Sequence, residues 1–207
     1  MALDAVFLSA VAKQLREQLL GAKLDKIYQN EKDELTIVFR TRNGARRLVL
    51  SAAANHPRAQ ITAQRTPNPA VAPNFGMLLR KHFGVSTLTS ITQPPFERVL
   101  DFTFACLSEL GDRVDKHIII EIMGKHANII VTDENGVIID AIKRVGYDMS
   151  SVRAVLPGLS YTPPPGQDKI LPDQLDARRF AGEVPVSYTH LDISFQNQRQ
   201  DDSQKHD

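Results

Sequence analysis

Apolar side chains near the amino terminus recur every three or four positions, the spacing that gathers them on one face of a helix. The residues at this spacing are Val6, Phe7, Ala10, Val11, Leu15, Leu19 and Leu20. Gly21 follows directly, and glycine readily adopts the left-handed conformation in which many helices end. The pattern therefore predicts an amphipathic helix that ends near Gly21.

From Lys23 onward, short runs rich in β-branched and aromatic residues replace the helical spacing, as is typical of strands. The first three runs cover residues 23–29, 34–41 and 45–52. Asn43-Gly44 lies between the last two runs, and this dipeptide favours a tight hairpin turn. We therefore predict a hairpin whose exposed positions carry basic residues.

A second group of elements follows a proline-rich loop over residues 66–73. Residues 74–83 again show helical spacing, which predicts a second helix. Further strand-like runs cover residues 86–93, 97–107, 116–123, 127–133 and 137–145. Short strands joined by hairpins, together with two helices, predict an α+β fold: a β-sandwich, or a flattened barrel, flanked by helices.

The carboxyl-terminal part of the chain departs from these patterns. Residues 156–169 hold too many prolines and glycines for a helix or a strand, so we expect a linker that leaves the domain. We place the main domain at residues 1–165, and the linker with the start of a helical segment at residues 166–185. Residues 186–207 are polar and without period, which predicts disorder.

Composition points to an ordinary globular protein inside the cell. The 207 residues are 42% hydrophobic and 24% charged, which suits one main hydrophobic core. The sequence contains no apolar run long enough to span a bilayer and no signal-peptide pattern at its start. Cys106 is the single cysteine and lies in an apolar run, so it is expected in the core of a protein kept in a reducing compartment. We therefore predict a cytoplasmic location and no membrane partner.

The net charge of +1 conceals an uneven distribution of charged residues. Between Leu35 and Phe96 the chain carries no acidic residue and eight basic ones: Arg40, Arg42, Arg46, Arg47, Arg58, Arg65, Arg80 and Lys81. Such a block concentrates positive potential, which attracts a polyanion such as RNA. The alternative is a solvated arginine-rich face, since arginines on strands often point into solvent beside apolar neighbours.

The sequence lacks the usual motifs of catalysis and cofactor binding. Its six histidines are scattered, and none is spaced from another histidine, a cysteine or a carboxylate as in a known metal motif. No nucleophile elbow, Walker-type phosphate loop or dinucleotide-binding glycine motif occurs. Met123-Gly124-Lys125 is interpreted as a turn at the end of a strand. We expect no metal and no cofactor.

The pair Glu97-Arg98 opens a predicted strand directly after Pro94-Pro95, so alternation would send one side chain inward and the other outward. One interpretation is a structural salt bridge within the sheet. The other is that Arg98 grips a phosphate or a base while Glu97 orients it, because guanidinium groups bind phosphate with paired donors. Tyr28 is the aromatic residue near the basic block whose ring edge we expect to be wet, as base stacking requires.

Five segments, taken in order, resemble the NFACT family, whose bacterial members are called RqcH or fibronectin-binding protein A-like and whose eukaryotic counterpart is NEMF. The segments are Met77–His82, Glu97-Arg98 after Ile91–Gln93, Glu121–Ile130, Ile138–Lys143, and Leu156–Gly158 with Tyr161 and Pro163–Pro165. Each segment is short, but their order and register across residues 1–165 make the resemblance specific.

The resemblance implies a fold like the amino-terminal domain of formamidopyrimidine-DNA glycosylases, a β-sandwich flanked by helices. It also implies a role in rescuing stalled translation: binding the large ribosomal subunit that carries peptidyl-tRNA, recruiting tRNA and supporting untemplated alanine tailing of the stalled chain. The ribosome would supply the peptidyl-transfer chemistry, so the protein itself would not be an enzyme. The family's acidic-arginine pair, needed for tRNA handling, falls on Glu97 and Arg98. The RNA-binding basic face would consist of Arg40, Arg42, Arg46, Arg47, Arg80, Lys81 and Lys125.

The chain departs from the family pattern at two positions and at its end. Glu97 stands where members usually have aspartate, and Asp4-Ala5 stands where they commonly have Asp-Gly. A helix-hairpin-helix domain would begin where the chain stops, so we expect a longer natural protein and a non-native tail at residues 186–207.

Two other functions remain open. One is a DNA glycosylase-like DNA-binding protein, disfavoured because Ala2 stands where those enzymes use a proline nucleophile. The other is a fibronectin-binding surface adhesin, which would require export.

Overall fold

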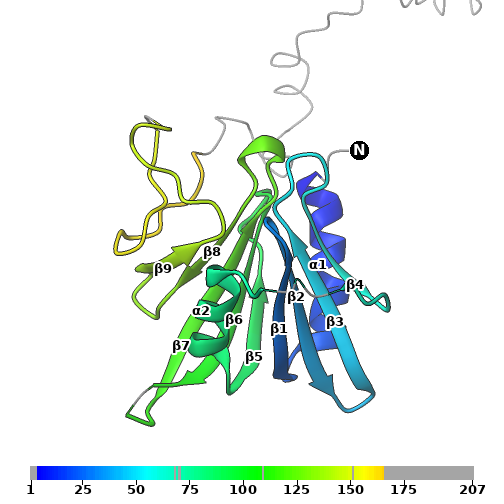
Figure 1. The fold of residues 1–207 in the computed structure, drawn as a ribbon. Helices are drawn as coiled ribbons and strands as arrows, with labels where there is room; N and C mark the ends of the chain where they lie inside the picture. Colours follow the sequence, from blue (N-terminus) through cyan, green and yellow to red (C-terminus); the bar gives the residue numbers. More distant parts are fainter. Residues whose placement is uncertain (1–3, 68, 70, 109, 151, 166–207) are drawn as a thin grey trace, which may run out of the picture. The chain divides into compact units, whose positions relative to one another are not determined.

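The computed structural model describes residues 4–67, 69, 71–108, 110–150 and 152–165. Within them, nine strands form one antiparallel sheet in the order β4-β3-β2-β1-β5-β6-β7-β8-β9, accompanied by two α-helices (Figure 1). The predicted α+β class is confirmed. No helix in this part of the chain is long and apolar enough to cross a membrane. The same residues contain no cluster of three or more His, Cys, Asp or Glu side chains arranged to hold a metal ion.

Helix α1 (Ala5–Leu19) confirms the predicted amino-terminal helix. It starts at Asp4, whose carboxylate accepts a hydrogen bond from the Phe7 backbone N–H at 2.7 Å, a standard way to satisfy a free donor at a helix start. The chain leaves the helix through Gly21, whose φ of +75° suits glycine. The buried side chains are Leu8, Ala12, Leu15 and Leu19. Val6 and Phe7, which were expected on the apolar face, are instead exposed.

The first half of the sheet contains strands β1 (Lys23–Glu31), β2 (Glu34–Thr41), β3 (Gly44–Ser51) and β4 (Arg58–Thr62). The first three confirm the prediction, including the turn before Gly44. β4 was not predicted, because its five residues carry only weak alternation of apolar and polar side chains. It pairs with β3 from Ser51↔Arg58 to Arg47↔Thr62 and forms one edge strand of the sheet.

Helix α2 (Asn74–Phe83) and the second half of the sheet also follow the prediction. The remaining strands are β5 (Ser86–Thr92), β6 (Val99–Leu107), β7 (Arg113–Glu121), β8 (Asn128–Thr132) and β9 (Ile138–Ala141). A short 3-10 helix, η1 (Gly124–His126), joins β7 to β8. Several boundaries differ from those expected: β6 begins two residues after Glu97, β7 covers Arg113–Glu121 instead of residues 116–123, and β9 ends before Lys143.

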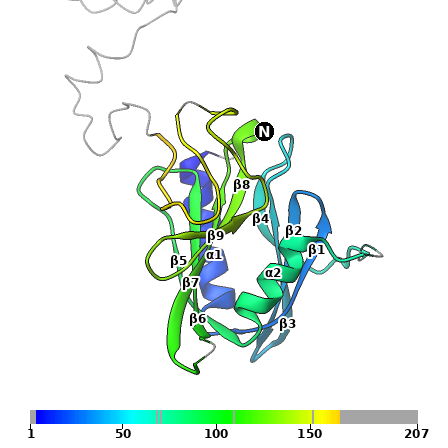
Figure 2. The same cartoon turned by 60° about the vertical axis from the view of Figure 1, so that its left-hand side comes forward.

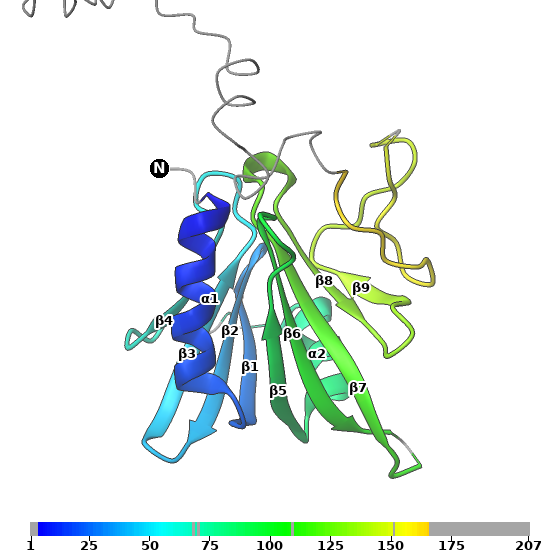
Figure 3. The same cartoon turned by 180° about the vertical axis from the view of Figure 1, so that it is seen from behind.

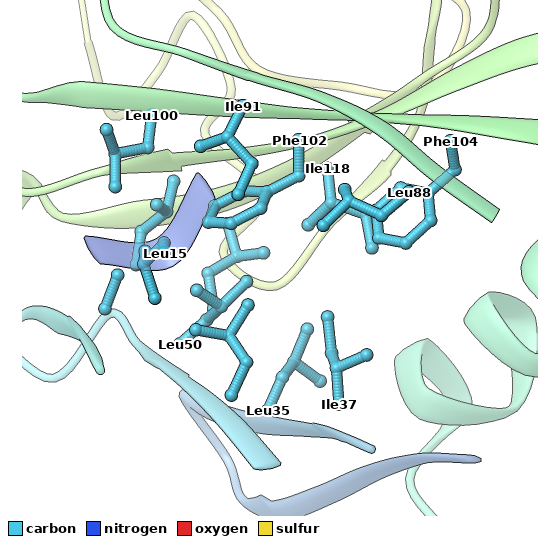
Figure 4. Close-up of a cluster of buried hydrophobic side chains, with 14 of the residues drawn as sticks. Leu15, Leu35, Ile37, Leu50, Leu88, Ile91, Leu100, Phe102, Phe104 and Ile118 are labelled. Atoms are coloured by element: carbon cyan, nitrogen blue, oxygen red, sulfur yellow. The ribbon is translucent and has the colours of Figure 1, made fainter. Parts of the chain in front are cut away.

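The main core lies between the two halves of the sheet, which face each other as layers (Figure 4). The Phe39 and Phe104 rings stack with 6.1 Å between their centroids. Cys106 is buried in this core, as predicted, and burial raises the pKa of its thiol to about 11. α1 and α2 pack against the core from opposite sides (Figures 1 and 3). The predicted sandwich is thus made from one sheet whose halves meet where β1 pairs with β5, instead of from two separate sheets.

A second, smaller core covers the outer face of strands β6 to β9. It consists of Val99, Ile119, Ile130, Ile138, Ala141 and Val155. Residues 156–165, predicted to leave the domain, fold back beside β9 (Figure 2). The Ile138 N–H donates to the Leu159 carbonyl at 2.8 Å, and the Tyr161 N–H donates to the Gly136 carbonyl at 2.8 Å. These isolated backbone hydrogen bonds hold the segment against the domain although it forms no regular helix or strand. The linker prediction is therefore wrong for these residues. The predictions for residues 166–185 and 186–207 lie outside the described residues.

Candidate nucleic-acid interface

Two sequence motifs meet at one end of the sheet, which we call the motif end: the loop Gln93–Arg98 before β6 and the turn Ile122–Ala127 after β7. The Ile122 N–H donates to the Arg98 carbonyl at 2.8 Å. The Gln93 side-chain amide donates to the Ala5 carbonyl at 2.9 Å and to the Glu97 carbonyl at 2.8 Å. The start of α1, the loop before β6 and the turn after β7 therefore fix the backbone around Glu97 and Arg98.

The loop itself contains a strained turn. The Glu97 N–H donates to the Pro94 carbonyl at 3.0 Å, which closes a four-residue turn. Phe96, at the third position of this turn, has a φ of +56°, a conformation normally taken by glycine or asparagine. For a bulky residue such a backbone costs about 1 to 3 kcal/mol. Phe96 is also 42% exposed, so its burial is incomplete.

The side chains of Glu97 and Arg98 are both half-buried. Neither forms a hydrogen bond or ion pair with the described part of the protein, so the predicted alternative of an internal salt bridge has no counterpart in this geometry. A half-buried guanidinium without a protein partner retains donors for a ligand, and phosphate accepts such paired donors well. The geometry is therefore compatible with the ligand-binding interpretation of the pair.

Glu97 also lines an acidic hollow of about 350 Å³ on the outer face of β6 and β7, with Asp101, His117 and Glu134 on its wall. The His117 Nδ1 atom lies 3.0 Å from both carboxylate oxygens of Asp101. This hydrogen bond raises the pKa of His117, although partial burial works in the opposite direction. Val99, Ile119 and Tyr161 of the second core form the apolar part of the lining.

Arg40, Arg42 and Arg46 gather around a second hollow of about 680 Å³, the basic hollow, which Lys23 also lines. It lies at the β2–β3 hairpin, at the opposite end of the sheet from η1 (Figure 1). Arg40 pairs with Asp25 at 2.7 Å. No hydrogen bond or ion pair to the described residues occupies the side chains of Lys23, Arg42 and Arg46. Several unpaired cations around one hollow repel each other, and a bound anion would relieve that repulsion.

The other predicted basic residues lie elsewhere, so the seven do not form one face. Arg47 follows Arg46 on β3 and points to the other side of the sheet, beside Thr62. On α2, the Arg80 side chain donates to the Ile27 carbonyl at 2.8 Å and lies over the Tyr28 ring at 5.7 Å from its centroid. Lys81 is exposed on the same helix, whereas Lys125 is exposed on η1 at the motif end.

Other motif residues have structural roles next to the second core. The buried Glu121 carboxylate accepts hydrogen bonds from Arg153 at 2.6 and 2.7 Å and from the Tyr161 hydroxyl at 3.0 Å. Burial raises the pKa of Glu121, and the hydrogen bonds and charge of Arg153 reduce this effect without cancelling it. The Lys143 ammonium donates to the carbonyls of Ala52 and Ala127. These contacts attach residues 142–150 and 152–165 to the sheet.

Residues 4–200 match the family described as NFACT N-terminal and middle domains. This chain belongs to the NFACT family. Over 173 residues the NFACT chain is 39% identical to the Rqc2 homolog RqcH of Bacillus subtilis (strain 168), covering 83% of this chain and 30% of that protein. It is 27% identical over 140 residues to the ribosome quality control complex subunit NEMF of Homo sapiens, covering 68% of this chain and 12% of that protein.

Solved structures give a consistent match for the NFACT chain. The amino-terminal domain of the fibronectin-binding protein PavA from Streptococcus pneumoniae superposes with a TM-score of 0.79 at 34% identity, covering 86% of this chain and 67% of that one. The amino-terminal part of the fibronectin/fibrinogen-binding protein from Streptococcus suis gives a TM-score of 0.80 at 34% identity, with the same coverage. The chain spans about 30% of the length of its bacterial relatives, so these matches concern one part of a larger protein.

Three features of the NFACT chain's candidate interface were not predicted from the sequence. Lys23 precedes the basic block, but its register opposite Arg40 brings it to the basic hollow. Asp101 and His117 lie on the same face of β6 and β7 as Val99 and Ile119 of the second core, and only the alternation of these strands hints at this position. The positive φ of Phe96 carries no sequence signal, because the turn Pro94–Glu97 lacks the glycine that usually marks it.

Proposed function

We propose that this NFACT domain serves in ribosome-associated quality control, as part of a cytoplasmic factor that binds the large ribosomal subunit and tRNA. The names of its relatives, Rqc2 homolog RqcH and ribosome quality control complex subunit NEMF, support that role. The domain would position tRNA so that the ribosome adds alanine residues, without a template, to the stalled chain on peptidyl-tRNA. It would contribute binding and orientation and no catalytic group of its own.

The observation that carries the proposal is the position of Arg98. Its backbone carbonyl is fixed by the Ile122 N–H, and its half-buried side chain has no bonding partner among the described residues. The fixed backbone sets where the side chain starts, and a guanidinium without a protein partner can present paired donors to a phosphate. Glu97 would orient the same ligand from the acidic hollow, with its carboxylate accepting hydrogen bonds from an amino group or a ribose hydroxyl.

Lys125 and the basic hollow would add contacts to phosphates farther along the RNA. Lys125 belongs to the motif end, whereas the basic hollow lies at the opposite end of the sheet (Figure 1). Phosphate contacts orient a nucleic acid without reading its sequence. A large RNA could therefore engage both ends while only the surroundings of Glu97 and Arg98 select the tRNA.

A second candidate, binding of fibronectin, is favoured by the solved structures that carry this name. Retention of the purified chain on immobilised fibronectin, measured beside retention of tRNA on purified large subunits, separates the two. The third candidate, a DNA glycosylase-like protein, depends on the predicted likeness to formamidopyrimidine-DNA glycosylases. Its expected nucleophile position, Ala2, lies outside the described residues.

The experiment that tests the proposal replaces Arg98 in the full-length protein. Arg98→Ala should weaken tRNA recruitment roughly ten- to a hundredfold and abolish tailing, because a charge-assisted hydrogen bond is lost. Arg98→Lys should also be impaired, since lysine cannot present paired donors. Glu97→Asp should be tolerated. The measurements are tRNA retention on purified large subunits and the thermal melting temperature.

Arg113→Ala is the matched control, because it removes an equally charged, exposed side chain at the start of β7. It should change neither measurement. If Arg98→Ala lowers the melting temperature while the folded variant still retains tRNA, Arg98 has a structural role and the proposed site is wrong.

A further inference from the structure

Phe96 combines two unfavourable features at one position of the motif end. Its backbone lies in the left-handed region, at a φ of +56°, and the residue is 42% exposed. Glycine or asparagine would adopt this backbone with less strain and would expose less apolar surface. Folding alone does not require a phenylalanine at this position. Residues held under strain often contribute to binding sites.

The surroundings fix the backbone that carries the ring. Pro95 precedes Phe96 and restricts the backbone on that side, and the Glu97 N–H to Pro94 carbonyl hydrogen bond of 3.0 Å closes the turn. Gln93 anchors the Glu97 carbonyl to the start of α1. An exposed aromatic side chain on a fixed turn loses little freedom on binding, so it can contribute most of its contact energy to a ligand.

We infer that Phe96 stacks on an unpaired nucleobase of the bound RNA while Arg98, two residues further along, holds an adjacent phosphate. Proteins bind single-stranded RNA by combining aromatic platforms for the bases with cationic groups for the backbone. Here a partly exposed Phe96, an Arg98 guanidinium without a partner among the described residues and the exposed Lys125 belong to the same end of the sheet. A purely apolar protein partner would leave the guanidinium without a counter-group. The inference rests on the proposed function, because it requires RNA at the motif end.

The first test separates ligand binding from folding by means of the strained backbone. Phe96→Gly and Phe96→Asn should leave the melting temperature unchanged or raise it, since both residues tolerate a positive φ. The same variants should bind single-stranded RNA from the tRNA roughly five- to a hundredfold more weakly, which is the usual value of one base stack. Phe96→Tyr should restore the affinity, because it keeps the ring.

Phe7→Ala is the matched control. Phe7 is 55% exposed and lies near the start of α1 in a regular helical backbone, so its loss removes a similar amount of apolar surface. If Phe7→Ala weakens RNA binding as much as Phe96→Gly does, the effect comes from general surface hydrophobicity and the stacking inference is wrong. The inference also fails if Phe96→Gly binds RNA with full affinity.

The second test detects stacking directly. The chain has no tryptophan, so Phe96→Trp places a single indole at the turn. Addition of single-stranded RNA should quench its fluorescence, because a stacked base quenches indole emission, whereas polyphosphate, which has no bases, should not. Binding of RNA without quenching would overturn the inference, as would equal quenching by polyphosphate.

The Arg98→Ala variant shows which of the two proposals has failed. If the unaltered protein binds no RNA, the proposed function fails and the inference fails with it. If Arg98→Ala loses RNA affinity but Phe96→Gly does not, the proposed function stands and the stacking inference alone is overturned. If Phe96→Gly binds RNA normally yet is released from large subunits, the ring contacts ribosomal protein, which also contradicts the inference.

Discussion

The two cores of the domain differ in what holds them together. The main core is built from aromatic and aliphatic side chains of both sheet halves, including the stacked Phe39 and Phe104 rings. The second core contains six buried residues and lies beside the buried ion pair of Glu121 with Arg153. The first relies on apolar area removed from water. Beside the second, a few polar contacts also hold irregular backbone in place.

Each core also ends in a hollow, and the two hollows carry opposite charge. Arg46 shares a face of β3 with the core residue Leu48, so the main core gives way to the basic hollow. Val99 and Ile119 of the second core line the acidic hollow beside Glu97. The two cores therefore determine where the charged side chains of each hollow reach the surface. Changes to the polar groups should test the second core and the two hollows separately.

The largest effect is expected from breaking the ion pair at the second core. Glu121→Ala leaves the Arg153 guanidinium, whose side chain is only 16% exposed, without its carboxylate. Removing one partner of a buried pair costs about 3 to 5 kcal/mol of unfolding free energy. Residues 142–165 should then detach from the sheet and become sensitive to protease. Urea denaturation and limited proteolysis measure the two effects.

Arg144→Ala is the matched control for this prediction. Arg144 pairs with Asp140 through two hydrogen bonds of 2.9 and 3.0 Å, but its side chain is 61% exposed. Water replaces such contacts readily, so this variant should have almost the same unfolding free energy as the unaltered protein. Equal losses from the two variants would show that burial of Glu121 does not distinguish the second core.

The sequence predicts the main core much better than the second core. The core residues of α1, α2 and most strands repeat with the period of their element, so short windows of sequence reveal them. The second core depends on partners far apart: Arg153 and Tyr161 reach Glu121 across 32 and 40 positions. Prolines and glycines after Val155 conceal this packing, since their local signal is that of a linker.

The candidate interface divides in the same way. The basic block is visible in the sequence, but the alternation of β3 sends Arg46 and Arg47 to opposite faces. The seven predicted cations therefore occupy several places, and Lys23 joins one of them through strand pairing. The surroundings of Glu97 and Arg98 depend on tertiary hydrogen bonds, from Ile122 to Arg98 and from Gln93 to Ala5, for which local patterns give no signal.

An intermediate effect is expected at the basic hollow, where neighbouring residues supply their own control. Arg46→Glu should weaken RNA binding roughly tenfold and reduce the slope of log affinity against log salt by about 1, because one phosphate contact is lost. Arg47→Glu makes the same charge change on the other face of β3 and should have a much smaller effect. Equal losses would indicate a diffuse basic surface, and no loss from either would indicate a solvated one. Titrations with tRNA at several salt concentrations decide among these outcomes.

The smallest effect is expected at the acidic hollow, where His117 and Asp101 form a partly exposed pair at 3.0 Å. The hydrogen bond raises the pKa of His117 in the folded protein. Protonated His117 therefore stabilises the folded state. This contribution is complete below the pKa of histidine in the unfolded chain, about 6.5, and is lost as pH rises through the higher pKa of the folded protein. Asp101→Asn should therefore lower the unfolding free energy most at about pH 6, by no more than about 1 kcal/mol, and much less under alkaline conditions.

His56→Gln, which removes a histidine from the loop before β4, serves as the control. Urea denaturation of the three proteins across this pH range is the measurement, and a loss that is equal at every pH would mean that Asp101 contributes through packing instead of through the charge on His117.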